Sequence, residues 1–335
     1  MKKIKMKRIL GIGNALVDVM TQIDNDKVLN DFDLPKGSMQ LVDQDKSNKV
    51  KSGTAKFSKS LASGGSAANT IHGLAMLGAE TAFIGSIGKD ETGDFFERDM
   101  KSAGVNTLLI RRDSVTGTAV ALISPDSERT FATHLGAATE LEAADLSADQ
   151  FKGHDILYLE GYLIFNKTLV ETACRMAKEN NMKVALDLAS YNVVEFKLQD
   201  FREIVEKYVD IVFANEEEAR AYTGKNPDEA LKILSEVCEI AVVKTGSEGS
   251  LIRRGDEVLK IGTIKVNLHD TTGAGDLYAS GFLYGYSNNY SLDICGQFGS
   301  VLAGNVIETI GAKMTDRIWE KIKIDIKDIL SLVSD

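Results

Sequence analysis

Residues 270–283 read Asp-Thr-Thr-Gly-Ala-Gly-Asp-Leu-Tyr-Ala-Ser-Gly-Phe-Leu, a polar turn that leads directly into an apolar stretch. The pattern predicts a helix that starts on bare backbone, because Gly273 and Gly275 carry no side chains. Such a helix start binds anions, since its first NH groups lack partners and it is the positive end of the helix dipole. Asp276 would repel a phosphate, but it is expected where a substrate hydroxyl loses its proton. We therefore interpret this stretch as catalytic, the alternative being that Asp276 only complements the helix dipole.

The composition is that of an ordinary globular chain. It has 335 residues, of which 44% are hydrophobic and 26% charged, with a formal net charge of -10. A general nucleic-acid-binding protein usually presents a basic face, so we expect no nucleic-acid partner. Cys174, Cys238 and Cys295 are widely spaced and odd in number, a pattern that indicates neither a disulfide framework nor a zinc site.

The N-terminus superficially resembles the start of a secretory signal, because basic residues precede an apolar run at residues 9–20. Asn14 and Asp18 interrupt that run, however, and no small-residue cleavage site follows. Nowhere do eighteen apolar residues stand together, so we expect no membrane-spanning helix and no membrane partner. The expected location is cytoplasmic.

Short apolar segments alternate with helical patterns along most of the chain. Strands are predicted at residues 8–13, 81–88, 156–160, 184–188, 211–214, 241–244 and 250–253, and helices at 94–104, 274–287 and 292–307. Such an alternation predicts an α/β fold with a doubly wound, mostly parallel sheet flanked by helices.

Two stretches depart from this alternation. Residues 19–56 show short β-prone pieces between turns and no strong helical periodicity, and residues 117–123 and 129–133 read as a hairpin. We expect these stretches to form a small β-sheet lid over the ligand-binding edge. The expected division is a main domain of residues 1–18, 45–112 and 136–335, with residues 19–44 and 113–135 as the lid.

Polar residues follow the first predicted strand and a Gly-Gly pair. Asn14 and Asp18 lie just beyond the strand's carboxyl end, where open α/β sheets bind ligands. Asp18 is therefore a candidate acceptor for a sugar hydroxyl, or else only the cap of a turn. Gly64 and Gly65 offer bare backbone before a helix rich in small residues, and Asn69 lies in its first turn. A tight loop with close helix packing explains the glycines but not the polar Asn69.

Three further spots have both functional and structural interpretations. Arg129 is suited to clamp a phosphate, although a solvated arginine on a strand is more common. Residues 215–218, Asn-Glu-Glu-Glu, supply oxygen ligands for magnesium, or simply an acidic first turn that stabilises a helix. Residues 244–249, Lys-Thr-Gly-Ser-Glu-Gly, form a turn that fits beneath a nucleotide or merely joins two strands, and they lack the ending of a P-loop.

Taken in order, these motifs resemble those of the ribokinase-like, or pfkB, family of carbohydrate and nucleoside kinases. The similar segments cover almost the whole chain: residues 270–276, residues 64–69, Asn215-x-x-Glu218 and Lys244-x-Gly-x-x-Gly249. The resemblance implies a doubly wound α/β domain with a small β lid. It also implies phosphorylation of a sugar-type hydroxyl, with ATP and Mg2+ as cofactors and a small-molecule substrate.

The resemblance further implies a role for each site residue. Asp276 is the general base, and the NH groups of Gly273, Ala274 and Gly275 hold the charge on the transferred phosphoryl group. Sugar hydroxyls are bound by Asp18, Gly64, Gly65 and Asn69, and Arg129 approaches the phosphates from the lid. Asn215 and Glu218 organise Mg2+ and its waters, Lys244, Gly246 and Gly249 form the nucleotide turn, and Asn305 lies in a helix that borders the adenine. Asp270 and Thr272 lie where relatives bind a monovalent cation such as K+.

Adenosine is the expected substrate, because residues 13–18, 63–69 and 37–43 resemble adenosine kinases most. Two departures favour the alternative of a ribokinase-like or fructokinase-like sugar kinase. Ala15 stands where many adenosine kinases have proline, and Glu160 ends a strand where sugar kinases hold a hydroxyl with a glutamate. Asn14 and Glu160 therefore join the substrate-binding candidates, and the candidates for an apolar slot around a base are Met39, Leu41, Tyr162 and Leu163.

Two other classes fit the sequence less well. A noncatalytic nucleoside or sugar sensor has no need of Asp276. A dehydrogenase needs Gly-x-Gly-x-x-Gly, whereas the first strand gives Gly-Ile-Gly-Asn-Ala-Leu. A monomer and a homodimer are equally compatible with the sequence.

Overall fold

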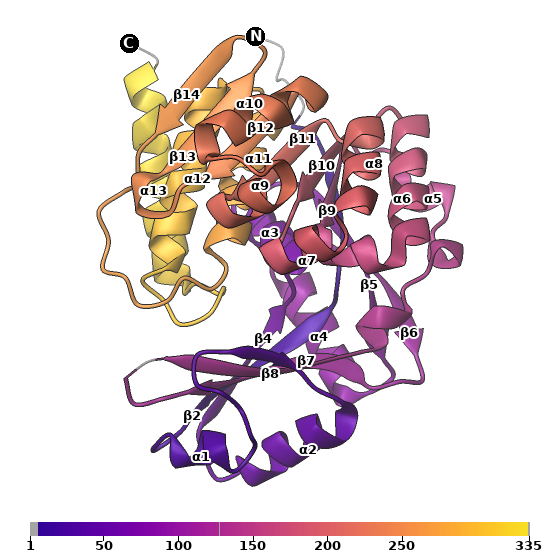
Figure 1. Cartoon of the computed structure of the whole chain (residues 1–335), viewed down its shortest axis with the longest axis vertical. Coiled ribbons are helices and arrows are strands. Elements are labelled where there is room, and N and C mark those ends of the chain that lie inside the picture. Colours follow the sequence, from indigo (N-terminus) through magenta and orange to yellow (C-terminus); the bar gives the residue numbers. More distant parts are fainter. Residues whose placement is uncertain (1–5, 127, 334–335) are drawn as a thin grey trace.

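The computed structural model describes residues 6–126 and 128–333, and within them the chain forms two β sheets (Figure 1). The larger sheet has nine strands in the order β14-β13-β12-β11-β10-β9-β1-β5-β6. In chain order they are β1 (Ile9–Ile12), β5 (Thr81–Gly88), β6 (Asn106–Arg112), β9 (Ile156–Glu160), β10 (Lys183–Asp187), β11 (Ile211–Asn215), β12 (Ile240–Lys244), β13 (Ser250–Arg254) and β14 (Glu257–Ile261). The seven strands β12, β11, β10, β9, β1, β5 and β6 pair in parallel, and β13 and β14 extend the sheet antiparallel. The predicted doubly wound, mostly parallel sheet is thus confirmed.

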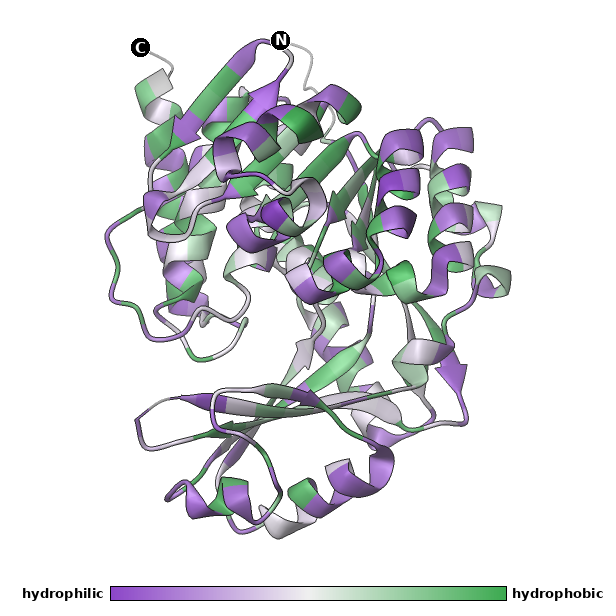
Figure 2. Ribbon diagram, in the orientation of Figure 1, coloured by the Kyte–Doolittle hydropathy of each residue, from purple (hydrophilic) through white to green (hydrophobic). Residues whose placement is uncertain are grey.

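Helices cover both faces of this sheet, because its strands are apolar on both sides. Successive residues turn to opposite cores, so that Ile9 and Phe213 join one core and Leu10 and Val212 the other. In Figure 2 the central strands are accordingly coloured hydrophobic, while α6 and α8 are hydrophilic on their outer sides. The first core contains α3 (Ser66–Met76), α4 (Glu91–Ser102) and α11 (Ala274–Ser287), and the second contains α6 (Lys167–Glu179), α8 (Leu198–Tyr208), α9 (Glu216–Thr223) and α10 (Pro227–Val237).

The second sheet has five strands in the order β3-β8-β7-β2-β4 and lies below the main domain in Figure 1. Its strands are β2 (Leu16–Gln22), β3 (Met39–Leu41), β4 (Lys59–Gly64), β7 (Thr116–Ile123) and β8 (Arg129–Gly136). The remaining helices are α1 (Lys27–Asn30), α2 (Gln44–Gly53), α5 (Ala148–Phe151), α7 (Tyr191–Phe196), α12 (Leu292–Val306) and α13 (Asp316–Val333). Of these, α2 packs against β7 and β8, on the side of the lid that faces away from the main domain.

The expected lid boundaries are corrected by this pairing. Strand β4 pairs antiparallel with β2, and β2 begins at Leu16, so residues 16–18 and 59–64 belong to the lid sheet rather than to the main domain. Helix α2, which the sequence did not predict, joins them. Its ten residues bury only Ser47 and Val50, so no apolar period reveals it.

Neither a disulfide nor a membrane span is part of the described chain. Cys174, Cys238 and Cys295 are free and buried. None of the helices within residues 6–126 and 128–333 has the length and apolar character that a bilayer crossing requires. In the same residues, no group of three or more histidine, cysteine, aspartate and glutamate side chains is arranged to hold a metal ion.

The fold brings the polar strand ends to one place. Because parallel strands share a carboxyl edge, Glu160 on β9, Asp187 on β10, Asn215 on β11 and Lys244 on β12 all lie along it. Helix α11 is held against this sheet by an edge-on contact of Phe282 with Phe213, with ring centroids 5.3 Å apart. Such a contact contributes about 1 kcal/mol, and it fixes the helix whose first turn faces the edge.

Candidate active site

Asp276 lies in the first turn of α11 and is tied to α3. Its Oδ1 accepts a hydrogen bond from Ser66 Oγ at 2.7 Å, and its Oδ2 accepts one from Asn69 Nδ2 at 3.0 Å. The helix can begin here because Gly273 adopts a left-handed conformation, with φ at 78°. A Cβ on Gly273 would lie 2.6 Å from Cβ of Ala312, so only glycine fits. The structure therefore brings together Asp276 and Asn69, and it adds Ser66, which the sequence did not single out.

The environment of Asp276 suits a base that works near neutral pH. Burial raises the pKa of its carboxyl to about 6, while the hydrogen bonds from Ser66 and Asn69 oppose that rise. Asp276 is therefore mostly ionised at pH 7 and still able to hold a proton. A general base is most effective when its pKa lies close to the working pH.

The expected phosphate cradle, made of the NH groups of Gly273, Ala274 and Gly275, stays a prediction, and one of these groups is already engaged. The NH group of Ala274 donates to Thr271 O at 3.1 Å, so it is already engaged and is not a free anion donor. Gly275 instead has a cation beside it, because a Cβ placed on this residue would lie 3.0 Å from Lys244 Nζ. The absence of a side chain at Gly275 thus leaves an ammonium group facing the start of α11.

Lys244 lies at the end of β12 and is paired with Asp187. Its Nζ donates to Asp187 Oδ2 at 2.8 Å, and both side chains are largely buried. From the sequence, Lys244 was assigned to a nucleotide turn and Asp187 was not singled out. Asp187 nevertheless lies near the end of the predicted strand 184–188, at the same sheet edge as Glu160. The pairing places a buried cation at this edge of the sheet, beside the start of α11.

Asn215 and Glu218 form a capping box at the start of α9. Glu218 accepts hydrogen bonds from the backbone NH of Asn215 at 2.7 Å and from its Nδ2 at 2.8 Å, and Asn215 Oδ1 accepts from the NH of Glu218 at 2.9 Å. Burial raises the pKa of Glu218 to about 7, with Lys244 lowering it and Asp187 and Asp276 raising it further. The carboxylates of Asp187, Glu218 and Asp276 thus lie around the single ammonium group of Lys244, which leaves an excess of negative charge at this edge of the sheet.

The turn after Lys244 has the geometry of a strand connection. Gly246 and Gly249 have φ at 53° and 100°, and they border a short 3-10 turn between β12 and β13. A Cβ on Gly249 would lie 1.9 Å from Ile261 O, so close backbone packing accounts for this glycine. A nucleotide role for the two residues stays a prediction.

Glu160 tethers two loops. Its Oε1 accepts from the backbone NH of Asn14 at 3.0 Å and from Asn14 Nδ2, and its Oε2 accepts from the NH of Ala67 at 2.8 Å. Burial raises the pKa of this carboxyl to about 7. Both oxygens are thus engaged by the protein, and the Asn14 side chain with them.

The Gly-Gly pair lets these loops approach closely. A Cβ on Gly64 would lie 2.5 Å from the Asp18 carboxyl group, and one on Gly65 would lie 2.0 Å from Asn14 O. Gly65 also has φ at 102°, which a side chain disfavours. The two glycines thus place Asp18 on the lid beside the start of α3.

The lid sheet presents one face to this site. Strand pairing puts Asp18, Ala119, Thr133 and Leu41 in one row across β2, β7, β8 and β3, with their side chains on the same face. The next row on that face contains Met20, Ala121, Phe131 and Met39. We call these two rows the lid face; it is apolar apart from Asp18 and Thr133, and Met39 and Leu41 are 53% and 66% exposed.

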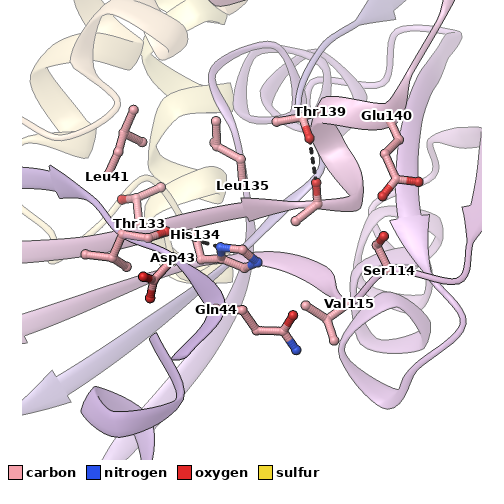
Figure 3. Close-up of a pocket in the computed structure, with 12 residues that line it drawn as sticks. Leu41, Asp43, Gln44, Ser114, Val115, Thr133, His134, Leu135, Thr139 and Glu140 are labelled. Carbon is pink, nitrogen blue, oxygen red and sulfur yellow. Dashed lines mark hydrogen bonds between the residues drawn. The ribbon is translucent and has the colours of Figure 1, made fainter. Parts of the chain in front are cut away.

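A hollow of about 400 Å³ lies at the outer end of β8, next to the lid face and away from Asp276. Figure 3 shows Leu41 of β3 and Leu135 of β8 on one side of the lid sheet, while His134 lies on the other side, toward Gln44. His134 Nδ1 lies 3.2 Å from Val42 O. Leu41 and Leu135 form the apolar side of this hollow, so apolar surface continues from the lid face along β8.

Arg129 joins the lid to the catalytic loop. Its guanidinium forms an ion pair with Asp270 and donates to Thr272 Oγ1 at 3.1 Å. Asp270 also accepts from the NH of Gly311 at 2.9 Å, and from the NH and Oγ1 of Thr272 at 3.1 and 2.8 Å. Asp270 therefore already has a cation from the protein itself, and a monovalent cation at Asp270 and Thr272 stays a prediction.

Asn305 and two of the apolar candidates do not line the site. Asn305 is 1% exposed, donates to Val301 O at 2.8 Å and accepts from Lys321 Nζ at 2.9 Å, so its side chain is committed inside the protein and cannot border a base. Leu163 is a buried core residue, and Tyr162 donates to Ala189 O. Met39 and Leu41 are the apolar candidates that remain open to a ligand.

Comparison with known proteins agrees with this geometry. A family model described as pfkB family carbohydrate kinase matches residues 37–317. The solved structure of adenosine kinase from Sinorhizobium meliloti is 33% identical, with a TM-score of 0.86 over 96% of this chain and 100% of that chain. A probable sugar kinase from Rhizobium etli CFN 42 is also 33% identical, with a TM-score of 0.86 over 96% and 99% of the two chains.

A more distant relative is also similar over most of the chain. Adenosine kinase from Dictyostelium discoideum is 28% identical over 334 residues, which cover 91% of this chain and 96% of that protein. The region matched by the family model, residues 37–317, includes the start of α11. The chain therefore belongs to the pfkB family of carbohydrate kinases and is an ATP-dependent sugar or nucleoside kinase.

Proposed function

We propose that this kinase transfers the terminal phosphoryl group of ATP to the 5'-hydroxyl of adenosine. The observation that carries the proposal is the lid face, which has a carboxylate at one end, Asp18, and exposed apolar side chains at the other, Met39 and Leu41. A nucleoside has the same division, with a polar sugar joined to a flat apolar base. Ligand sites are mostly apolar with a few placed polar groups.

The dimensions of the lid face favour a ligand longer than a free sugar. Asp18 and Leu41 lie three strands apart in one row, which corresponds to about 14 Å at the usual spacing of neighbouring strands. With its sugar at Asp18 and Asn69, a nucleoside extends along the row toward Leu41. A free pentose would leave the exposed leucine and methionine uncovered.

Phosphoryl transfer depends on positioning and charge neutralisation more than on covalent help. In our proposal Asp276 accepts the proton of the 5'-hydroxyl, with Ser66 and Asn69 fixing its orientation. Lys244, beside Gly275, and Arg129, beside Thr272, supply positive charge around the phosphate, together with the start of α11. One preorganised donor of this kind is worth about a hundredfold to a thousandfold in rate.

The acidic edge fits magnesium. Glu218 and Asp187 are buried carboxylates near Asp276, and Lys244 is the cation that neutralises them in the described structure. Mg2+ keeps several waters and is bound through one or two carboxylates and the phosphates of its nucleotide. Glu218 and Asp187 are therefore the residues that would hold Mg2+ through its waters, and the ion would neutralise charge on the phosphates.

Glu160 does not favour the sugar-kinase alternative. Its two oxygens already accept hydrogen bonds from Asn14 and Ala67, so it does not present a free carboxylate to a sugar hydroxyl. The presence of a buried, hydrogen-bonded Asp276 likewise disfavours a noncatalytic sensor, which has no use for a base.

The test is direct measurement of phosphorylated product by chromatography with adenosine, inosine, ribose and fructose, each with ATP and Mg2+. We expect kcat/KM for adenosine to exceed that for either free sugar by at least about a hundredfold. Turnover of ribose or fructose without turnover of adenosine contradicts the nucleoside assignment. Binding of adenosine without any product would indicate the sensor.

Two exposed leucines on opposite faces of the lid sheet provide a variant and its matched control. Leu41→Ser should raise KM for adenosine, because it removes apolar contact with the base. Leu61 is 51% exposed but pairs with Val19, so it lies on the opposite face of the same sheet, and Leu61→Ser should leave KM unchanged. Equal KM values in the two variants contradict a base site on the lid face.

A further inference from the structure

Lys313 is a buried cation that neither the sequence motifs nor the proposed mechanism uses. It lies between α12 and α13, in a segment whose Gly311 donates to Asp270 and whose Ala312 packs against Gly273. A Cβ on Gly311 would lie 3.5 Å from Cε of Met20, which is two residues from Asp18 on the same face of β2, so this segment lies against the part of the lid that carries Asp18. Its Nζ is buried and finds no hydrogen-bond partner among the described residues. An ammonium group in such a place is costly unless nearby negative charge compensates it.

Four titratable groups face Lys313 from the elements packed around it. They are Asp18 on β2, Asp99 on α4, Asp276 on α11 and His72 on α3. Burial, with a smaller effect from Lys313, lowers the pKa of His72 well below its usual value, so His72 is neutral at pH 7. The negative charge that compensates Lys313 therefore comes from the three aspartates.

Of these aspartates, Asp18 is the one without a hydrogen bond. Asp99 accepts from the NH of Ser63 at 2.9 Å, and Asp276 accepts from Ser66 and Asn69. The Asp18 side chain accepts no hydrogen bond from residues 6–126 or 128–333; the charged groups around it are Lys313, Asp276 and Arg129. Its oxygens are thus left for a ligand, and nearby positive charge must keep it ionised.

We propose that Lys313 is a positioning residue of this kinase, whose buried ammonium holds Asp18 as a free carboxylate that accepts the hydroxyl hydrogen bonds of the substrate. This inference rests on the proposed function, since it assigns Asp18 to the substrate. Under this inference Lys313 affects substrate binding through Asp18 and does not affect ATP binding. An ionised acceptor matters because hydrogen bonds to charged groups are about twice as strong as neutral ones.

The charges around Asp18 predict the direction of the pH effects. Burial raises the pKa of Asp18 to about 6; Lys313 and Arg129 oppose the rise, and Asp276 adds to it. Removing the Lys313 charge must therefore raise the pKa of Asp18 further. Burial also lowers the pKa of Lys313 to about 8, so the ammonium is lost above that pH. The wild-type kcat/KM for the substrate should fall below about pH 6 and above about pH 8.

The experiment compares Lys313→Met and Lys313→Arg in the full chain, with product measured directly so that no coupling enzyme limits the pH range. The substrate is whichever nucleoside or sugar the wild type phosphorylates. In Lys313→Met we expect KM for the substrate at pH 7 to rise about tenfold and the acid limb to move up by about one pH unit. KM for ATP should stay within about twofold. Lys313→Arg should restore KM and should extend activity above pH 8, because arginine keeps its charge there.

A double-mutant cycle with Asp18→Asn shows whether Lys313 acts through Asp18. Adding Lys313→Met to Asp18→Asn should change KM no further, and multiplicative effects of the two changes overturn the inference. An acid limb that does not move in Lys313→Met overturns it as well. Lys323→Met is the control for loss of a lysine, because Lys323 is exposed on α13 and forms a surface ion pair with Glu320.

A titration by carbon NMR of aspartate-labelled protein separates this inference from the proposed function. The Asp18 signal is identified by its loss in Asp18→Asn. Its pKa should be higher in Lys313→Met than in the wild type, and it should stay close to the wild-type value in Lys313→Arg, because arginine keeps the positive charge. An inactive wild type contradicts the proposed function and leaves this titration to decide the role of Lys313. An unshifted Asp18 pKa in folded Lys313→Met overturns the inference whatever the activity.

Discussion

Ser66 Oγ donates to Asp276 Oδ1 at 2.7 Å, across the interface of α3 and α11. The two residues are 210 positions apart in the chain, yet they belong to the two helix starts that form the site. Thr70 and Ser280 strengthen the same interface, because each donates from its hydroxyl to a backbone oxygen of the other helix. The candidate base is thus oriented by a helix that carries the substrate loop, so substrate binding and base position are coupled.

Asp276→Asn should abolish most turnover without unfolding the protein. The amide cannot accept the hydroxyl proton, and a general base is worth about a hundredfold to ten-thousandfold in rate. The measurement is kcat, with the thermal midpoint and ATP binding measured on the same protein. A kcat within tenfold of the wild type would show that Asp276 is not the base.

Ser66→Ala should shift the pH dependence of kcat. The Ser66 hydrogen bond opposes the rise of the Asp276 pKa, so its loss raises that pKa above about 6. Because the base works when ionised, the acid limb of kcat should move to higher pH, by about one unit. Ser86→Ala is the matched control, since Ser86 is buried in β5 and its hydroxyl has no partner among the described residues. An identical shift in both variants contradicts a specific role for Ser66.

Lys244→Met should lower both activity and stability. It leaves Asp187 buried without its partner, which costs about 3–5 kcal/mol of unfolding free energy, and it removes positive charge beside Gly275. The double variant Asp187→Asn with Lys244→Met should recover part of the stability, because no unpaired charge remains, but none of the kcat. Recovery of kcat together with stability would show that Lys244 is only structural.

Much of the fold followed from pattern alone. The seven predicted strands of the main sheet are short apolar runs that are visible in the sequence, because most of their residues are buried. The edge strands β6 and β14 are partly exposed and mix polar with apolar residues, so the sequence did not predict them. The lid was harder to delimit, because β4 reads Lys-Ser-Leu-Ala-Ser-Gly and α2 is almost wholly polar. Pairing with β2 and packing against β7 decide both elements, and such tertiary contacts have no local signal.

The residues of the site also divide into those that could be recognised from the sequence and those that could not. Residues in the glycine-bearing turns, such as Asp276 and Asn69, were recognisable because a polar group next to bare backbone is unusual. Asp187 was not, since it lies in an ordinary apolar strand and its ion-pair partner, Lys244, is 57 positions away in the chain. Lys313 was not either, since its burial depends on tertiary packing that has no local signal. Asn305 shows the converse error, because a polar residue in an apolar helix proved to be satisfied by Val301 and Lys321.

Gly273→Ala should remove activity by displacing a neighbouring loop. The residue has φ at 78°, which costs an alanine about 1–2 kcal/mol, and its new Cβ would lie 2.6 Å from Cβ of Ala312. The segment that contains Ala312 also carries Gly311, whose NH binds Asp270, so the change reaches the loop before α11. We expect kcat to fall by more than about a hundredfold.

The variant Gly78→Ala separates the effect of backbone strain from the effect of the contact with Ala312. Gly78 has φ at 88°, but a Cβ there would meet nothing within 4 Å. Both variants therefore carry similar backbone strain, and thermal unfolding should show a similar loss from it, whereas only Gly273→Ala also disturbs Ala312. Activity should be retained in Gly78→Ala and lost in Gly273→Ala. Equal activity in the two variants would mean that the close contact of Gly273 with Ala312 does not control the geometry of the start of α11.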